Sequence, residues 1–165
     1  MAGSAYSPEE IETIYRRNFT LVYQLCLVLM RSVPDAEDAA QTVFRRVMER
    51  EQPFCDLEHE RAWLIVTARN ECRDQLKHWW RARREDPSAL DGLAWEQPGD
   101  GFVWEQVAAL PGKHRLVLFL HYYEGYTTDE IARMLGENPS TLRSRLVQAR
   151  RKLKLRLEAE GYGNT

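Results

Sequence analysis

The apolar residues of this chain recur at helical spacing along almost its whole length, and no segment shows the sustained alternation typical of a strand. Two sequences typical of a helix N-terminus occur within this pattern. Ser7-Pro8-Glu9-Glu10 and Thr127-Thr128-Asp129-Glu130 each place a hydroxyl three residues before a glutamate, an arrangement that opens a helix. Without a sheet, helices bury their apolar faces only against one another. The sequence therefore predicts an all-α fold.

Three long helices are predicted in the first half of the chain, at about 8–33, 35–50 and 60–84, with a loop over 51–59. Val33-Pro34 should end the first helix, because the residue before a proline leaves the α region. Asp35 is suited to cap the second helix. The first helix is expected to bury Ile11, Ile14, Tyr15, Phe19, Val22, Leu25 and Leu29. Trp63, which belongs to the third helix, should be buried in the core.

A change of composition divides the chain into two modules. Residues 85–100 hold two prolines, two glycines and five acidic residues, and this composition predicts a linker. We therefore expect one helical module over 1–84 and a second over 101–165. The helices of the second module are predicted at about 101–109, 112–124, 128–135 and 139–158.

The second module carries the signature of a helix-turn-helix. Gly136 is placed to end one helix in the left-handed conformation, and Asn138-Pro139 is placed to start the next. That last helix should bury Leu142, Leu146, Ala149, Leu153 and Leu157, which leaves Ser140, Thr141, Arg143, Ser144, Gln148 and Arg151 on other faces. Hydroxyls can bind phosphates, and arginines can bind guanine bases. A helix with this face is therefore suited to the major groove of DNA. A plain helical hairpin with a solvated basic face is the alternative.

Charge is strongly segregated along the chain, although the formal net charge is only −2. Residues 61–84 hold seven basic and two acidic side chains, and residues 133–156 hold eight and one. Acidic stretches precede both blocks. Because fields are screened within about 8 Å, local sign matters more than the total. Solvated helix faces would explain one basic block, but two favour a polyanionic partner.

The third helix interleaves basic residues with tryptophans. This pattern suits single-stranded or melted DNA, because cations follow the backbone and rings stack on unpaired bases. The residues concerned include Arg69, Asn70, Arg73, Lys77 and Trp79. Trp79 and Trp80 cannot both face inward from one helix. The alternative is that the tryptophans simply fill the core.

Several classes of protein are disfavoured. The three cysteines are widely spaced and form no CxxC pair, which argues against a disulfide scaffold or a zinc finger and favours reduced, intracellular thiols. The longest apolar run has six residues, and the N-terminus has no features of a signal peptide, so we expect a cytoplasmic protein with no membrane insertion. The histidines are isolated and no nucleotide-binding loop occurs, so no enzyme activity, cofactor or metal site is predicted.

Three stretches together resemble bacterial RNA polymerase sigma factors of the extracytoplasmic-function group of the sigma-70 family. They are Asp35-Ala36-Glu37-Asp38-Ala39-Ala40-Gln41-Thr42-Val43-Phe44, then Trp63-Leu64 with Ala68-Arg69-Asn70 and Asp74, and then the helix-turn-helix. In the last stretch the resemblance rests on Leu110-Pro111, Tyr126 to Ala132, Gly136, Ser140 to Leu146 and Ala149-Arg150. The resemblance covers about residues 8–158.

The resemblance implies a function and a site for each module. The second helix would dock on the clamp helices of the polymerase β′ subunit through Asp35, Asp38, Gln41 and Phe44. The loop and third helix would bind the non-template strand of the minus-ten element through Phe54, Asp56, Arg69, Asn70, Arg73, Lys77 and Trp79. The minus-thirty-five element would be bound through Thr127, Ser140, Thr141, Arg143, Ser144, Arg145 and Gln148. The β flap and an anti-sigma factor are the further partners expected.

Two departures from the family pattern are visible. Thr42 stands where the family usually has an acidic residue, and His114 and Leu116 replace the more usual Gln and Glu beside Arg115. A stand-alone dimeric helix-turn-helix regulator is the alternative function. It accounts for 127–158 but leaves the first module without a role. An enzyme acting on nucleic acid is disfavoured, because no acid–base or metal cluster is evident.

Overall fold

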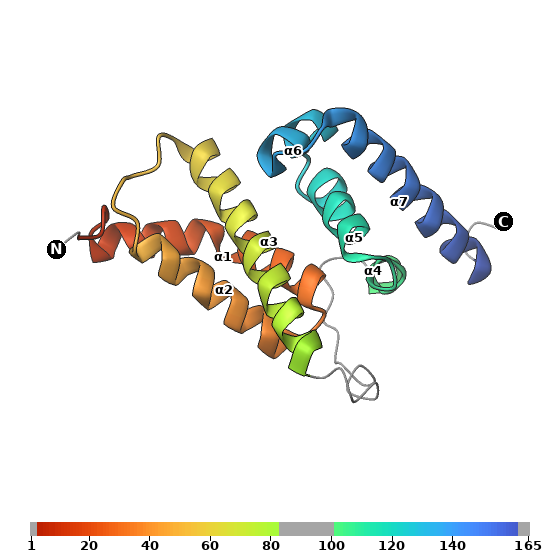
Figure 1. Cartoon of the computed structure of the whole chain (residues 1–165), viewed down its shortest axis with the longest axis horizontal. Helices are drawn as coiled ribbons and strands as arrows, with labels where there is room; N and C mark the ends of the chain where they lie inside the picture. Colours follow the sequence, from red (N-terminus) through yellow and green to blue (C-terminus); the bar gives the residue numbers. More distant parts are fainter. Residues whose placement is uncertain (1–2, 83–100, 162–165) are drawn as a thin grey trace. The chain divides into compact units, whose positions relative to one another are not determined.

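The computed structural model describes residues 3–82 and 101–161, and within these residues every regular element is helical (Figure 1). The elements are α1 Pro8–Met30, α2 Val33–Met48, α3 Leu57–Ala82, α4 Gly101–Ala108, α5 Gly112–Leu118, the π-helical turn η2 Phe119–Tyr123, α6 Thr128–Leu135 and α7 Pro139–Ala159. The predicted all-α fold is confirmed. The predicted linker 85–100 and residues 83–84 lie outside the described residues, as does the side chain of Trp80.

The chain forms two compact units, the first built from α1–α3 and the second from α4–α7. In the first unit α1 packs against both α2 and α3. Leu25, Val43 and Leu64 are fully buried where these helices meet. Two cysteines, Cys26 of α1 and Cys72 of α3, are also fully buried. Burial of such side chains contributes roughly 1.5–3 kcal/mol each and holds the three helices together.

The start of α1 follows its predicted capping box. The Ser7 hydroxyl accepts a hydrogen bond from the Glu10 amide at 3.2 Å, and the Glu10 carboxylate accepts one from the Ser7 amide at 3.1 Å. The predicted junction with α2 is wrong. Helix α1 ends at Met30, Arg31 takes the left-handed conformation at φ 59°, and Ser32 rather than Asp35 caps α2. Proline fits the first turn of a helix, where its missing amide is not needed.

Three further expectations for the first unit are corrected. Tyr15 and Phe19 are exposed instead of buried, because α1 contacts α2 and α3 along one stripe and these aromatic rings flank it. Helix α3 begins at Leu57, three residues earlier than predicted, and Trp63 is half-buried. The Asp56 carboxylate accepts a hydrogen bond from the His59 amide at 2.7 Å, which explains the early start of α3.

In the second unit the predicted helix-turn-helix is present. Thr127 and Glu130 form the capping box of α6, and Gly136 ends α6 with φ 70°. The Asn138 side chain accepts from the Ser140 amide at 2.9 Å and starts α7. The predicted helix over 112–124 instead changes from α to π geometry at Phe119. Phe119 is fully buried there.

Candidate functional site

Five of the seven residues predicted to bind the minus-thirty-five element line one hollow between α5 and α7. The hollow has a volume of about 410 Å³. Its α7 lining consists of Ser140, Thr141, Ser144, Arg145 and Gln148, and α5 contributes Lys113 and His114. The rotation of α7 explains this grouping, because Leu142, Leu146 and Ala149 are buried and turn the polar residues outward. A polar hollow with basic side chains is suited to an anion.

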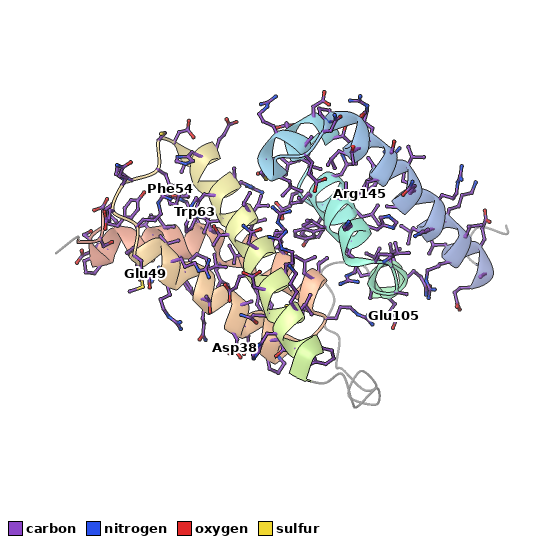
Figure 2. The ribbon with its side chains drawn as sticks, in the orientation of Figure 1. Asp38, Glu49, Phe54, Trp63, Glu105 and Arg145 are labelled. Atoms are coloured by element: carbon purple, nitrogen blue, oxygen red, sulfur yellow. The ribbon has the colours of Figure 1, made fainter. Side chains whose placement is uncertain are left out.

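Two arginines of α7, Arg143 and Arg145, are paired with acidic residues of the helix-turn-helix. Arg143 Nη1 lies 3.2 Å from the Asp129 carboxylate, with 58% of its side chain exposed. Arg145 Nη1 lies 2.6 Å from the Glu137 carboxylate, with only 17% exposed (Figure 2). Arg143 and Thr127 are not in the hollow. The Thr127 hydroxyl accepts from the Glu130 amide at 3.1 Å and thus caps α6.

Sequence reasoning missed two residues of the hollow, Lys113 and His114. They follow Leu110-Pro111 along the chain, and only the packing of α5 on α7 brings them next to the polar residues of α7. His114 is 7% exposed, and its Nδ1 atom has no hydrogen-bond partner. Burial lowers the pKa of His114, and the positive charges of Lys152, Arg145 and Lys113 lower it further.

An aromatic cluster organises the loop before α3. The half-buried Phe54 ring lies 5.4 Å from the Trp63 ring and 6.0 Å from the Tyr6 ring (Figure 2). The Arg50 guanidinium lies over two of these rings, 4.1 Å from the Phe54 centroid and 4.9 Å from the Trp63 centroid. A guanidinium over aromatic faces is a cation–π contact. The loop is thus held by rings from three separate segments.

The N-terminal residues also fasten this loop, which sequence reasoning did not anticipate. The Phe54 amide donates a hydrogen bond to the Tyr6 hydroxyl at 2.6 Å. The Ala5 amide donates to the Arg50 carbonyl at 2.7 Å. These contacts join positions more than forty residues apart, so no local pattern could have indicated them. The loop conformation depends on residues that precede α1.

Most of the remaining residues predicted to bind the minus-ten element lie along α3. Arg69, Asn70 and Trp79 are half-buried, whereas Arg73 and Lys77 are exposed. Arg69, Arg73 and Lys77 are spaced by four residues and so share one face of the helix. Arg73 Nη2 donates to the Asn70 side chain at 3.3 Å. Asp56 lies on the exposed loop, but its carboxylate is engaged as the cap of α3.

The residues predicted to contact the polymerase differ in exposure along α2. Asp38 and Gln41 are exposed and Asp35 is half-buried, but Phe44 is only 7% exposed. The Phe44 ring packs edge-on against Tyr15 at 4.9 Å. From Tyr15 an aromatic ladder continues along α1, with 5.1 Å between the Tyr15 and Phe19 centroids and 5.6 Å between those of Phe19 and Tyr23. Acidic and aromatic groups thus occur together on α1 and α2.

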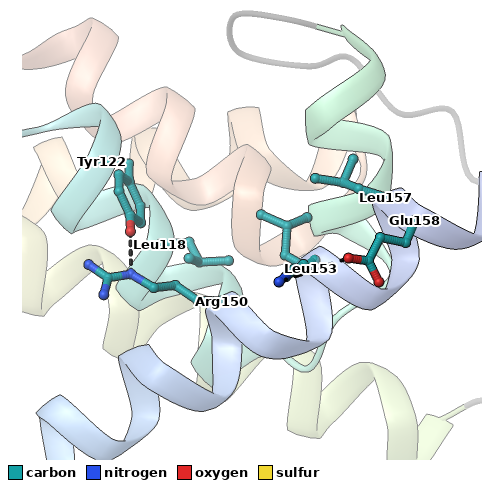
Figure 3. Close-up of a pocket in the computed structure, with 7 residues that line it drawn as sticks. Leu118, Tyr122, Arg150, Leu153, Leu157 and Glu158 are labelled. Atoms are coloured by element: carbon teal, nitrogen blue, oxygen red, sulfur yellow. Dashed lines mark hydrogen bonds and ion pairs between the residues drawn. The ribbon is translucent and has the colours of Figure 1, made fainter. Parts of the chain in front are cut away.

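A second hollow in the second unit is largely apolar (Figure 3). It has a volume of about 400 Å³ and lies between the α5–η2 segment and the C-terminal part of α7. Leu118, Leu153 and Leu157 line it. At one end the Arg150 guanidinium donates to the Tyr122 hydroxyl, as the dashed line shows. Such a groove suits the apolar face of a partner helix.

The described residues provide no evidence for a metal centre or a membrane span. Among residues 3–82 and 101–161 no three His, Cys, Asp or Glu side chains group as metal ligands would. No helix in that part of the chain is long and apolar enough to cross a membrane.

Comparison with known proteins assigns both units to one family. The model for sigma-70 region 2 matches residues 14–83, and the model for sigma-70 region 4 matches residues 103–153. The ECF RNA polymerase sigma factor SigL of Mycobacterium tuberculosis is 26% identical over 160 residues, which cover 92% of this chain and 90% of SigL. The probable sigma factor RfaY of Xanthomonas campestris is 32% identical over 78% of this chain and 36% of its own length.

Solved structures show the same fold. The sigma factor RpoE of Bartonella quintana, solved in complex with the anti-sigma factor NepR, has a TM-score of 0.73 at 18% identity and covers 91% of this chain and 98% of RpoE. CnrH, solved with the cytosolic domain of CnrY, has a TM-score of 0.65 at 22% identity, over 94% of this chain and 92% of CnrH. Sigma factors are regulatory subunits of transcription, not enzymes. This chain belongs to the sigma-70 family of RNA polymerase sigma factors, in its extracytoplasmic-function group.

Proposed function

We propose that this chain directs core RNA polymerase to promoters by binding two DNA elements, one with each unit. The minus-thirty-five element binds the second unit, and the minus-ten element binds the first. The observation that carries the proposal is the hollow along α7, where five predicted DNA-binding residues and two further polar residues converge. Their convergence on the second helix of a helix-turn-helix, the helix that enters the major groove, supports the proposal.

The recognition step divides between phosphates and bases. The exposed hydroxyls of Thr141 and Ser144 lie in the first turns of α7, where they and the helix N-terminus suit phosphate oxygens. The Ser140 hydroxyl donates to Asn138 Oδ1 and would have to leave it to bind a phosphate. Arg143 is exposed and reaches solvent, so it is suited to a guanine edge, which arginine binds with two hydrogen bonds. The exposed Gln148 lies about one and a half turns beyond Arg143 on the same helix.

The melting step uses the first unit. Extruding a base from the duplex costs a few kcal/mol, which a protein recovers by stacking and hydrogen bonding. The loop offers the exposed edge of the Phe54–Trp63–Arg50 cluster for this purpose. Arg73 and Lys77 on α3 supply positive charge along the adjacent single strand. The loop therefore captures an unpaired base of the non-template strand while α3 binds its backbone.

Core polymerase binds two surfaces in this proposal. On the first unit, Asp38 and Gln41 supply exposed polar groups beside the aromatic ladder of Tyr15, Phe19 and Tyr23, and this surface binds the β′ clamp helices. Aromatic side chains surrounded by polar ones are typical of energetically dominant interface positions. On the second unit, the apolar groove of Figure 3 receives an apolar segment of the β flap.

An anti-sigma factor is the expected regulator. Both structural neighbours named above were solved with a regulatory protein bound, RpoE with NepR and CnrH with CnrY. We infer that a protein of this class covers the polymerase-binding or DNA-binding surfaces of this chain. Occlusion of those surfaces would hold the sigma factor inactive until the inhibitor is released.

The test is binding to purified core polymerase followed by run-off transcription on a promoter library. Retention on core with selective transcripts is the expected result. Absence of core binding, together with tight binding of duplex DNA by the isolated chain at ~10⁻⁸ M, would instead establish a stand-alone helix-turn-helix regulator. Asp38→Arg serves as the docking variant. Glu49→Arg, an exposed charge reversal at the other end of α2, is its matched control.

A further inference from the structure

We propose that the hollow between α5 and α7 binds a backbone phosphate of promoter DNA, with Lys113 supplying charge and His114 a contact formed with uptake of a proton. The inference rests on the proposed DNA-binding function of the second unit and adds two residues from α5 to it. It also predicts that DNA binding by this chain depends on pH.

The chemistry of the lining fits a phosphate. The Thr141 and Ser144 hydroxyls and the Gln148 amide line the hollow, and each offers a hydrogen-bond donor. The Ser140 hydroxyl also lines it but donates to Asn138 Oδ1 at 2.7 Å. Lys113 is exposed at the start of α5 and adds a full positive charge. The charge of Arg145 is partly neutralised by Glu137, whose carboxylate lies 2.6 Å from Arg145 Nη1. The net charge that faces an anion therefore comes mainly from Lys113 and the nearby Lys152.

His114 is the unusual residue of the hollow. It is 7% exposed, yet its Nδ1 atom has no hydrogen-bond partner, so no neighbouring protein group fixes which ring nitrogen carries the proton. Buried polar atoms are normally satisfied, and an unsatisfied one requires an explanation. The His114 ring lines the hollow, so the negative charge of a phosphate there would stabilise the imidazolium and recover the cost of charging a buried ring.

The direction of the pH effect follows from the charges that surround His114. In the free protein burial lowers the pKa of His114, and Lys152 and Arg145 of α7 and Lys113 of α5 lower it further. A bound phosphate adds a negative charge and raises that pKa. Between the pKa of His114 in the free chain and its higher pKa in the complex, the complex holds more protons than its free components. Affinity for DNA therefore increases as the pH falls through this range. A rise of about one pKa unit on binding corresponds to a tenfold increase in affinity.

The decisive experiment follows the His114 Cε1 proton by NMR in the full chain, with its signal identified by its loss in His114→Gln. The signal is titrated with pH alone, with a ~20-bp duplex at ~50 mM salt, and with sodium sulfate. The duplex is expected to raise the pKa of His114 by about one unit. An unchanged pKa in the presence of bound duplex overturns the proposal, and so does absence of duplex binding at this salt concentration. A rise with sulfate but not with duplex assigns the hollow to a free anion instead and also overturns it.

Fluorescence anisotropy with the same duplex supplies the second readout. The affinity of the wild-type chain should increase about tenfold more between ~pH 8 and ~pH 5.5 than that of His114→Gln. The matched control is His121→Gln, because His121 lies in the same unit outside the hollow and should keep the wild-type pH dependence. Glutamine suits this position, since the family resemblance places it there. Equal pH dependence in wild type and His114→Gln would refute the phosphate contact.

Binding to core polymerase separates this inference from the proposed function. Both the wild type and His114→Gln should bind core equally, because the hollow is not among the proposed polymerase-binding surfaces. Loss of core binding by both proteins would defeat the sigma-factor function without deciding the fate of the hollow. Normal core binding, together with a His114 pKa that the duplex does not change, would refute only the proposed phosphate site.

Discussion

The stability of the first unit should depend on a buried carboxylate at the start of α3. Glu60 is only 3% exposed, and it accepts hydrogen bonds from Arg17 Nε at 2.8 Å, from Arg17 Nη2 at 2.5 Å and from Asn18 Nδ2 at 2.9 Å. Burial alone would raise the pKa of Glu60. The hydrogen bonds from Arg17 and Asn18 and the charge of Arg17 outweigh burial and lower it. The network therefore links α1 to the first turn of α3, just after the loop that precedes α3.

We predict that Arg17→Met destabilises the first unit more than Glu60→Gln does. Methionine preserves much of the side-chain volume but leaves the buried carboxylate with Asn18 as its hydrogen-bond donor. Breaking a fully buried ion pair costs about 3–5 kcal/mol. Here 42% of the Arg17 side chain is exposed, so water partly compensates, and we expect about 2–3 kcal/mol. Glu60→Gln removes the charge itself and should cost about 1 kcal/mol.

The pH dependence supplies the stricter test. In the wild type the lowered pKa of Glu60 gives stability that is present above its unfolded-state value and lost as the pH falls through the folded-state value. In Arg17→Met the cation is gone and burial dominates, so the carboxyl group protonates more easily. The deficit of that variant should shrink as the pH is lowered from about 7 to about 4.5.

Hydrogen exchange of α1 and α3 amides measures these differences in the first unit alone. The double variant Arg17→Met with Glu60→Gln should be about as stable as Glu60→Gln, because the two residues act as one pair. Additive losses in the double variant would refute the reasoning. A larger loss from Glu60→Gln than from Arg17→Met, or a deficit that does not change with pH, would refute it as well.

Four further substitutions or reactions test other parts of the structure. Tyr6→Phe removes the acceptor of the Phe54 amide, so exchange of that amide should accelerate about tenfold. Gly136→Ala places a side chain at φ 70° and should destabilise the second unit by about 1 kcal/mol in denaturant titrations. Asp38→Arg should weaken core binding at least about tenfold while circular dichroism stays unchanged, because its side chain is exposed. A maleimide should label only the exposed Cys55 in the native chain and all cysteines after unfolding.

Local chemistry made much of the fold predictable. The caps at Ser7, Thr127 and Asn138 and the left-handed Gly136 depend on residues within one turn, and the structure contains all four as predicted. The prediction of the α1–α2 junction was wrong because Pro34 is compatible with two local structures. A proline ends a preceding helix or occupies the first turn of the next one, and the sequence does not distinguish these outcomes.

Tertiary packing determined what the sequence could not. Tyr15 and Phe19 have the spacing of core residues, but two neighbouring helices cover only one stripe of α1, so these rings remain exposed. In the candidate site, the residues on α7 were predictable because they share one helix. Tyr6 and His114 were missed because each meets its site through contacts between segments far apart in the sequence.

The ion pairs of the two units have different consequences for DNA binding. In the first unit the two buried acidic residues of α3 are paired with arginines of other helices, Glu60 with Arg17 and Glu71 with Arg46. These pairs neutralise the buried acidic groups, so α3 presents Arg73 and Lys77 to solvent as a positive surface. The positive charge of that helix is therefore available to a single strand of DNA without rearrangement.

In the second unit Arg143 and Arg145 of α7 are already paired with carboxylates, so a DNA contact by either one would require it to exchange partners. The Arg143–Asp129 pair is exposed on both sides and contributes about 1 kcal/mol at most, so the proposed DNA contact would displace Asp129 at little cost. The Arg145–Glu137 pair is short and largely shielded, and leaving Glu137 unpaired would cost more. Arg143 is thus the better choice for reading a base, and Arg145 for holding the turn between α6 and α7. Substitution of Arg143 by alanine should relax sequence preference by about 1–3 kcal/mol at one base pair, whereas substitution of Arg145 should chiefly lower stability.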